Sequence, residues 1–235
     1  MYQLAPNVFA CTTGRNCMFL DLRQDRYLSI PKERMDALAP QIHGWNLASG
    51  ACASQTSQSG DVEQLAEHML EAGILCPYHC GSLIARPHAP PATRDFTSLY
   101  KPHSTPRLRG EWVGTFAALV SADYALRHAP LWRIIRRISP HAPQFGTAYR
   151  ADLVTTAWAL AERFRAIRPW FPRNYLCLFD SLALTLLLRR RGIRASWIFA
   201  VREDPFAAHC WVQYGDLVLN EHLDRTRVYT PIMTV

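Results

Sequence analysis

A proline-rich segment divides the chain into two stretches with different hydrophobic patterns. Residues 82–107 contain few apolar side chains and five prolines, namely Pro87, Pro90, Pro91, Pro102 and Pro106. Proline fixes φ and lacks a backbone N–H, so such a segment is typical of a semi-rigid linker. We therefore predict a linker over residues 82–107, one domain over residues 1–81 and a second domain over residues 108–235.

The first domain begins with three short runs of strand-forming residues. They cover residues 8–12, 17–21 and 26–30 and are separated by turn-forming residues. Helices are expected from residue 31 to 43 and from Asp61, as N-cap, to Gly73, as C-cap. The pattern predicts a winged-helix-like domain, made of a three-stranded antiparallel ribbon plus helices. A role in packing alone is the alternative to a binding role.

The edge of this ribbon could accept an extended peptide as an additional strand. We expect the peptide to add near residues 27–30 and to pack on the helix of residues 62–70. The candidate binding residues are Tyr27, Leu28 and Ile30 on the strand and Leu65 and Met69 on the helix. Because alternate strand residues face opposite sides, at least one of Tyr27 and Leu28 is expected to belong to the core.

The second domain is predicted to consist of helices followed by strands. Helical spacing and stop signals indicate helices over residues 112–128, 131–138, 147–167 and 174–191. Strand-forming runs follow at residues 195–202, 207–213, 217–221 and 227–233. Strands that follow helices in this way indicate the α+β class, with an antiparallel sheet near the end of the chain.

The formal net charge of +7 comes largely from arginine clusters, such as Arg133, Arg136 and Arg137 and residues 189–191. Such clusters attract nucleic acid, acidic peptides or phosphate groups, but they are also typical of solvated helix faces. Aromatic residues are not interleaved with the arginines at a spacing that would stack bases. No nucleic acid partner is therefore expected.

The sequence shows no signal for secretion, a membrane or a metal. Residues 1–10 lack the features of a signal peptide, and no stretch reaches the roughly 18 apolar residues of a membrane span. We expect a soluble cytoplasmic protein, in which the seven cysteines are reduced. Cys76, His79 and Cys80 lack a further ligand pair at zinc spacing, so no metal site is predicted.

One cysteine has a position that favours chemistry. Cys177 lies in the first turn of the predicted helix that begins near Asn174, where unpaired N–H groups and the helix dipole stabilise an anion. A thiolate is the nucleophile of cysteine enzymes. Since Leu176 and Leu178 flank this residue, a buried apolar role is the alternative.

A histidine on a later strand is the candidate base for Cys177. His209 lies in the run of residues 207–213, and an imidazole on a strand beside a helix-borne thiol is typical of an acyl-transfer site. The order in the chain is cysteine, histidine and then an acid. The backbone N–H of Cys177 would be one donor of the oxyanion hole.

The candidate acid, Glu221, depends on the length of a hairpin loop. A three-residue loop over residues 214–216 would pair Glu221 with His209 on the same face of the sheet. A two-residue loop would place Glu221 beside Cys210 instead. Asp216 would lie more than about 20 Å along the strand from His209 and is interpreted as a turn residue.

Four blocks of residues carry a resemblance to a known family. They are residues 177–184, residues 192–195, residues 206–213, and Gly215 with Asn220 and Glu221. In this order and spacing they resemble the B protein of lasso-peptide biosynthesis, a leader peptidase of a transglutaminase-like, papain-like cysteine protease family. The ribbon, with residues 20–22 and 26–28, resembles the leader-recognition element of peptide-tailoring systems. The chain is similar to the fused form of the two.

The resemblance implies that a ribosomal precursor peptide is cleaved after its leader, with Cys177 and His209 as the catalytic pair. It also implies an asparagine-synthetase-like lasso cyclase as partner, which would close the lactam on the freed amine. The family usually carries Asp where this chain has Glu221. Its cleavage has been associated with ATP alongside the cyclase, but this chain has no Walker-type phosphate loop, so no cofactor is assigned.

Two other functions remain open on the same residues. A leader-binding adaptor with a degenerate catalytic domain would explain the missing Asp. An amide-forming acyltransferase would use the same acyl-enzyme but transfer it to an amine instead of water.

Overall fold

The computed structural model describes residues 1–45, 59–78, 90–95, 97, 111–139 and 150–235. The chain divides into two compact units. The first comprises Met1–Arg86 and Val201–Ala207, and the second comprises Pro87–Ala200 and Ala208–Val235. Each unit has a hydrophobic core of its own.

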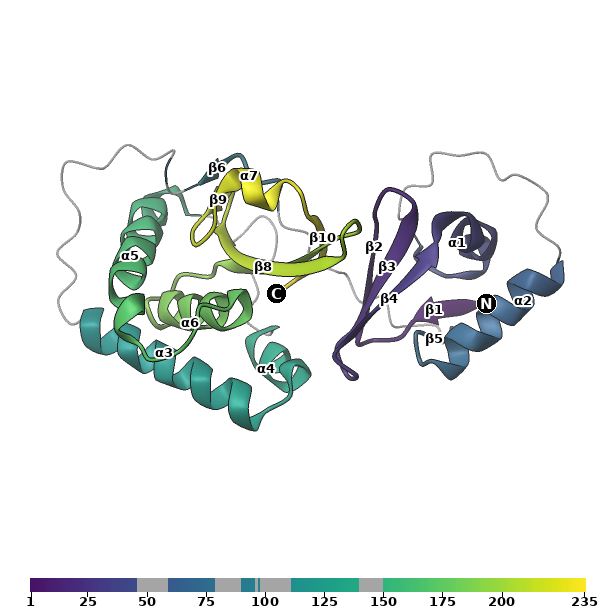
Figure 1. The fold of residues 1–235 in the computed structure, drawn as a ribbon, viewed down its shortest axis with the longest axis horizontal. Coiled ribbons are helices and arrows are strands. Elements are labelled where there is room, and N and C mark those ends of the chain that lie inside the picture. Colours follow the sequence, from purple (N-terminus) through teal and green to yellow (C-terminus); the bar gives the residue numbers. More distant parts are fainter. Residues whose placement is uncertain (46–58, 79–89, 96, 98–110, 140–149) are drawn as a thin grey trace. The chain divides into compact units, whose positions relative to one another are not determined.

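A three-stranded antiparallel sheet with the order β2-β3-β4 lies in the first unit (Figure 1). Its strands are β2 (Val8–Thr12), β3 (Asn16–Asp21) and β4 (Arg26–Pro31). These bounds agree with the predicted runs to within one residue, because each run contains several apolar residues and ends at a turn signal. Asp25, in the turn between β3 and β4, has a positive φ of 50°.

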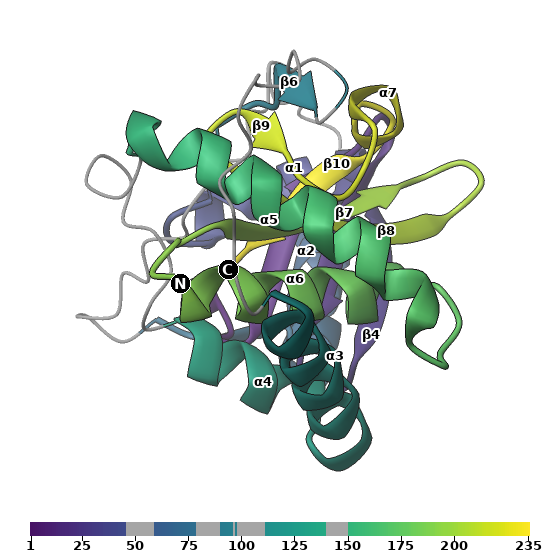
Figure 2. The same cartoon turned by 90° about the vertical axis from the view of Figure 1, so that its left-hand side faces the viewer.

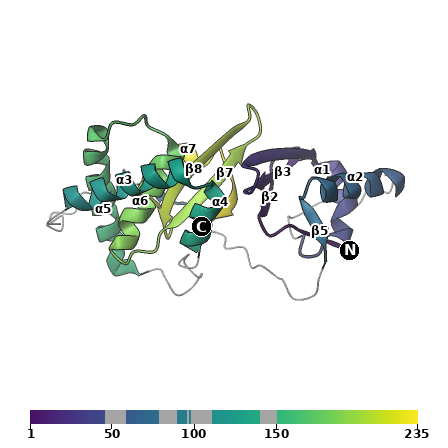
Figure 3. The ribbon, with the colours of Figure 1, turned by 90° about the horizontal axis from the view of Figure 1, so that it is seen from below.

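Two helices pack on the same side of this sheet (Figures 1 and 3). They are α1 (Lys32–Leu38), which a 3₁₀ turn over Ala39–Gln41 follows, and α2 (Ser59–Glu71). Gly73 has a positive φ of 70° after α2, as a C-cap glycine requires. Asp61 is not the N-cap, because α2 begins two residues before it; Asp61 lies in the first turn instead.

A two-stranded antiparallel sheet in the first unit is absent from the sequence prediction. It pairs β1 (Tyr2–Leu4) with β5 (Leu75–Pro77). Each strand has three residues, which is too short a run to give a strand signal. The pairing connects the start of the unit to the segment that follows α2.

The described part of the second unit contains four longer helices, and the last of them is central. They are α3 (Glu111–His128), α4 (Leu131–Ile138), α5 (Val154–Ile167) and α6 (Cys177–Arg190). In Figure 1, α6 lies between the sheet and α3. Figure 2 shows α5 and α6 in front of the same face of the sheet. Eight residues of α6 are buried, as expected for a helix that is covered on both sides.

The sheet of the second unit has the order β10-β7-β8-β9-β6. Its strands are β7 (Ser196–Arg202), β8 (Ala207–Tyr214), β9 (Leu217–Val218), β10 (Thr230–Thr234) and β6 (Arg94–Asp95). The short helix α7 (Leu223–Thr226) comes before β10. Strands β8 and β9 pair antiparallel, whereas β6 and β9 pair parallel. The α+β fold class predicted from the sequence is confirmed.

Strand β6 lies within residues 82–107, the range predicted to be a linker. It joins the sheet through the turn of the β8–β9 hairpin, where the Asp216 carbonyl accepts the N–H groups of Thr93 and Arg94. The Arg94 guanidinium also pairs with the Asp216 carboxylate at 2.6 Å. Asp95 then accepts the N–H of Leu223, the first residue of α7, at 2.9 Å. Two polar residues give no strand signal, so this anchoring is not visible in the sequence.

Within the residues that the structure describes, no helix has both the length and the apolar character that would let it cross a membrane.

Candidate active site

Cys177 is the first residue of α6, three positions later than the helix start predicted near Asn174. The residue before it, Leu176, has extended backbone and makes no side-chain cap. The first N–H groups of a helix lack intrahelical partners, and the macrodipole adds partial positive charge at this end. Both effects favour the thiolate form of the half-buried Cys177 side chain.

The buried Arg168 anchors the loop that leads into α6. Its Nε donates to the carboxylate of Asp180, which lies in the first turn of α6. Its terminal nitrogens donate to the backbone carbonyls of Phe171, Arg173 and Asn174. Burial raises the pKa of the Asp180 carboxyl, and the arginine opposes this shift. Through its hydrogen bonds to these carbonyls, Arg168 therefore fixes the backbone just before Cys177, and its ion pair ties that backbone to the first turn of α6.

His209 on β8 contacts both other predicted catalytic residues. Its Nε2 lies 2.7 Å from Oε2 of Glu221, and the two side chains are 9% and 12% exposed. The other oxygen of Glu221 accepts the N–H of His222 at 3.0 Å, and Arg225 lies 3.5 Å from Oε2. Since Nε2 is engaged, Nδ1 is left for the hydrogen bond between His209 and Cys177. The structure thus brings the three predicted side chains together.

The predicted three-residue loop, which pairs Glu221 with His209, is wrong, because the β8–β9 hairpin has another register. The turn has two residues, Gly215–Asp216, because Tyr214 pairs with Leu217. The glycine has a positive φ of 61°, as tight two-residue hairpin turns require. Continued beyond β9, this register would place Glu221 opposite Cys210.

Glu221 reaches His209 because the chain leaves the ladder after β9. The Leu219 N–H still donates to the Val212 carbonyl at 2.9 Å. The Val212 N–H, however, donates to Oδ1 of the Asn220 side chain at 2.7 Å. A side chain therefore replaces a backbone partner, and the segment after it is free to turn toward the imidazole.

Hydrogen bonds stabilise the thiolate of Cys177. The Cys210 side chain is the largest contributor and His209 the next, and the Cys210 N–H adds a further bond. Burial raises the pKa of Cys177, but these hydrogen bonds outweigh it and lower the pKa from 9.0 to about 4. The pKa of Cys210 itself is raised well above 9.0, because the neighbouring thiolate and burial both oppose its ionisation. Cys177 is therefore the reactive thiol of the two.

The imidazole is held in its charged form. Burial disfavours that charge, but hydrogen bonds with Cys177 and Glu221 outweigh it and raise the pKa of His209 from 6.5 to about 9. The pKa of Glu221 is lowered although burial opposes this, because His209, the His222 N–H and Arg225 stabilise the carboxylate. Between about pH 4 and pH 9 the site therefore holds a thiolate–imidazolium pair.

The pH dependence of alkylation tests this ion pair. We expect the rate at which iodoacetamide modifies Cys177 to stay nearly constant from pH 8 down to about pH 5, since its pKa is about 4. The rate for glutathione should fall roughly tenfold per unit below its own pKa of about 8.5. The modified residue is identified by peptide mass spectrometry. The shape of the profile is the readout, because nucleophilicity falls together with pKa.

Cys11 is the internal control for this measurement. It is buried, and burial raises its pKa to about 12, so it should not react over the same range. A Cys177 rate that falls tenfold per unit from pH 8 downward would contradict the ion pair.

Residues 116–234 match the family model of the transglutaminase-like superfamily. The chain belongs to this superfamily. The matched range contains all three residues of the Cys177 site, and its fold is of the cysteine protease and acyltransferase type. No curated protein and no solved structure matches the chain.

Three residues at the transglutaminase-like site were not predicted. Cys210 is missed because side chains alternate along β8, so the residue after His209 is expected on the opposite face of the strand. In the structure its side chain nevertheless hydrogen-bonds to Cys177. Arg168 and Asp180 are missed because residue type does not distinguish a buried ion pair from solvated charges. The position of Arg168 between apolar Ile167 and Pro169 is the available signal.

The predicted peptide-binding residues of the first unit have different surroundings. Leu28 and Ile30 on β4 are half-buried and pack against the core, and Tyr27 is also half-buried. Leu65 and Met69 on α2 are 7% and 3% exposed and belong to the core itself. The helix residues thus support the strand from behind and present little surface to a peptide.

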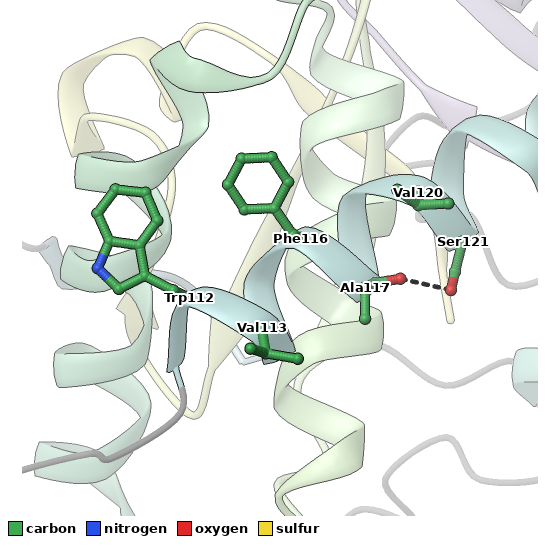
Figure 4. A pocket seen from close by; sticks show the side chains of 6 residues that line it. All are labelled: Trp112, Val113, Phe116, Ala117, Val120 and Ser121. Carbon is green, nitrogen blue, oxygen red and sulfur yellow. Dashed lines mark hydrogen bonds between the residues drawn. The ribbon is translucent and has the colours of Figure 1, made fainter.

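A groove on the outer side of α3 is a separate feature (Figure 4). It is lined by Trp112, Val113, Phe116, Ala117, Val120 and Ser121. No residue of the catalytic arrangement lines this groove, so it is not the reaction site.

Within the described residues, no group of three or more His, Cys, Asp or Glu side chains could hold a metal ion. Two of the three candidate zinc ligands, His79 and Cys80, lie outside those residues.

Proposed function

We propose that this chain is a cysteine peptidase that removes the leader from a ribosomally synthesised lasso-peptide precursor. The observation that carries the proposal is the contact of Cys177 with His209, and of His209 with Glu221, at the start of α6. The resemblance of the surrounding blocks to lasso B proteins supports the substrate class.

The arrangement can perform amide hydrolysis in two steps. The Cys177 thiolate attacks the scissile carbonyl carbon, and the N–H groups at the helix start offer donors to the developing oxyanion. The His209 imidazolium gives its proton to the departing amine, which leaves an acyl-enzyme. Neutral His209 then takes a proton from water as the water attacks the thioester, and Cys177 is released as thiolate. Glu221 keeps the imidazole oriented and stabilises its charge in both steps.

The first unit is the proposed leader-binding domain, with β4 as the acceptor strand. In the described part of the chain, β4 is an edge of its sheet, with β3 on one side. An extended leader could add to this edge through backbone hydrogen bonds with β4. The half-buried side chains of Leu28 and Ile30, which pack against the core, would lie next to it.

The register of β3 and β4 indicates which backbone groups face the free edge. The Lys32 N–H donates to the Arg15 carbonyl at 2.9 Å, and Asn16 is the partner of Pro31. Hydrogen-bonded pairs alternate along an antiparallel ladder, so the N–H of Ser29 should point away from β3. Ser29 is exposed and is therefore a candidate donor to the leader.

Replacement of this donor tests the leader site. We expect Ser29→Pro to weaken leader binding about tenfold, since proline removes one N–H and adds a ring where the leader would lie. Proline is tolerated on the solvent side of an edge strand, so the fold should persist. Fluorescence anisotropy with a labelled leader peptide measures the affinity.

The matched control is Ser29→Ala, which removes the hydroxyl and keeps the N–H. It should bind as the unchanged chain does. Equal affinity of the proline and alanine variants would reject strand addition at β4, provided that circular dichroism shows both variants folded.

The proposed partner is the asparagine-synthetase-like cyclase, which would use the amine that cleavage frees. Any ATP requirement would then belong to the cyclase, because the sequence has no Walker-type loop. The precursor is expected among the short reading frames beside the gene. A cytoplasmic location would keep the Cys177 thiol reduced.

Acyl transfer to an amine is the second candidate, because the transglutaminase-like superfamily match fits either fate of the acyl-enzyme. Incubation of the full chain with precursor and cyclase in ¹⁸O-water separates the two. Hydrolysis places ¹⁸O in the new carboxylate of the leader, whereas amide exchange gives a leader joined to the amine and no label. Binding of the precursor without any shortening would support the adaptor and reject both reactions.

A further inference from the structure

Two polar side chains, Ser181 and Asn220, connect the three segments that carry the catalytic residues. Ser181 lies one turn after Cys177 on α6 and is fully buried. Its hydroxyl donates to the carbonyl of Cys210, the residue after His209, at 3.2 Å. The Cys177 helix is thus tied directly to the strand that carries the base.

The third segment is tied to the same hydroxyl. Nδ2 of Asn220, the residue before Glu221, donates to Oγ of Ser181 at 3.0 Å. Oδ1 of the same amide accepts the N–H of Val212 on β8 at 2.7 Å. One side chain therefore bridges α6 and β8 from the segment that carries the acid.

We propose that Ser181 and Asn220 are positioning residues for the catalytic triad. This inference rests on the proposed peptidase function, for which the relative placement of three segments sets the rate. Each bond of the network ends within one residue or one helical turn of a triad member. A shift of about 1 Å in such a site can cost about 10²-fold in rate, so these contacts can act without touching substrate.

The network also explains why the acid comes from outside the ladder. The Asn220 amide takes the position of a backbone acceptor for Val212, which ends sheet pairing one residue before Glu221. The amide of Asn220 accepts from β8 through Oδ1 and donates to Ser181 through Nδ2, so one side chain holds both neighbours at once. The identity of residue 220 therefore fixes where the chain turns toward His209.

Ser181→Ala and Asn220→Ala, made singly and together in the full-length chain, test the proposal. We expect each single variant to lower precursor cleavage at least about tenfold, mainly in kcat. The double variant should lose little more than the worse single one, since each replacement removes the bond that the two residues share.

The pH profile of Cys177 alkylation is a second readout, and it distinguishes a positioning role of Ser181 and Asn220 from a role in stability alone. When the three segments separate, the thiolate loses partners, so the midpoint of the pH profile for Cys177 alkylation should rise by about one unit or more. A role in stability alone would lower the thermal unfolding midpoint and leave the alkylation profile in place. That outcome would overturn the proposal.

Thr185→Val is the matched control. Thr185 is another buried hydroxyl on α6, one turn further along, and it donates within the helix to the Ser181 carbonyl at 2.8 Å. We expect this variant to lose stability but to keep the alkylation profile of the unchanged chain. A shift as large as that of Ser181→Ala would show that any buried hydroxyl loss on α6 has the same effect.

The two readouts also distinguish failure of this inference from failure of the proposed function. Alkylation does not require a substrate, so a shifted profile supports positioning even if no precursor is cleaved. Cleavage that depends on Cys177 but is unchanged in both single variants would reject the positioning role and leave the peptidase proposal intact.

Discussion

Replacement of Cys177 by alanine is expected to lower precursor cleavage by at least about 10³-fold, the largest effect among the variants considered. The substitution removes the attacking sulfur and leaves the 2.7 Å contact between His209 and Glu221 in place. Because the thiolate is one cause of the raised imidazole pKa, the pKa of His209 should also fall from about 9. Single-turnover assays with purified precursor measure the rate, and an NMR titration of His209 measures the pKa.

Cys76→Ser is the control for this variant. Cys76 is a half-buried thiol on β5 in the other unit, so its loss changes the cysteine count without touching the site. Cleavage by the Cys177→Ala variant at the rate of the unchanged chain would refute the nucleophile. Unchanged leader binding by that variant would show that recognition and chemistry are separable.

The sequence predicts the elements of the fold well where hydrophobic periodicity is strong. Helix α4 has the predicted bounds, and β2 differs by no residue. Prediction from the sequence fails where an element is made of two or three residues, as in β1, β5 and β6, because such short runs carry no periodic signal. These short strands depend on tertiary partners that lie far along the chain.

The candidate site is predicted for a reason that is partly incorrect. Cys177 and His209 follow from a helix start and a strand, both of which are local features. Glu221 follows from a three-residue loop, whereas the turn is Gly215–Asp216, a dipeptide that already favours a two-residue hairpin. Its contact with His209 arises from a side-chain hydrogen bond to the strand, which pairing rules for backbones do not anticipate.

Replacement of Glu221 by glutamine is expected to lower kcat by about 10²-fold or more. The amide has nearly the same volume and can still accept from Nε2, but it lacks the charge that helps to raise the pKa of His209. The alkaline limb of the kcat profile should therefore move below about pH 9, because the imidazolium loses its proton earlier. Glu221→Asp keeps the charge on a shorter side chain and should lose less, about tenfold, with a smaller shift of that limb.

Asp224→Asn is the matched control for the charge at Glu221. Asp224 lies in α7, three residues further along, and its side chain is 94% exposed and paired with Arg227 at 3.3 Å. Its replacement removes one negative charge from the same segment without removing a contact to His209, so kcat and the alkaline limb should stay unchanged. If Glu221→Gln also kept both, the acid would have no orienting role. If both variants moved the limb equally, the effect would come from the net charge of the segment, and the 2.7 Å contact would not be its cause.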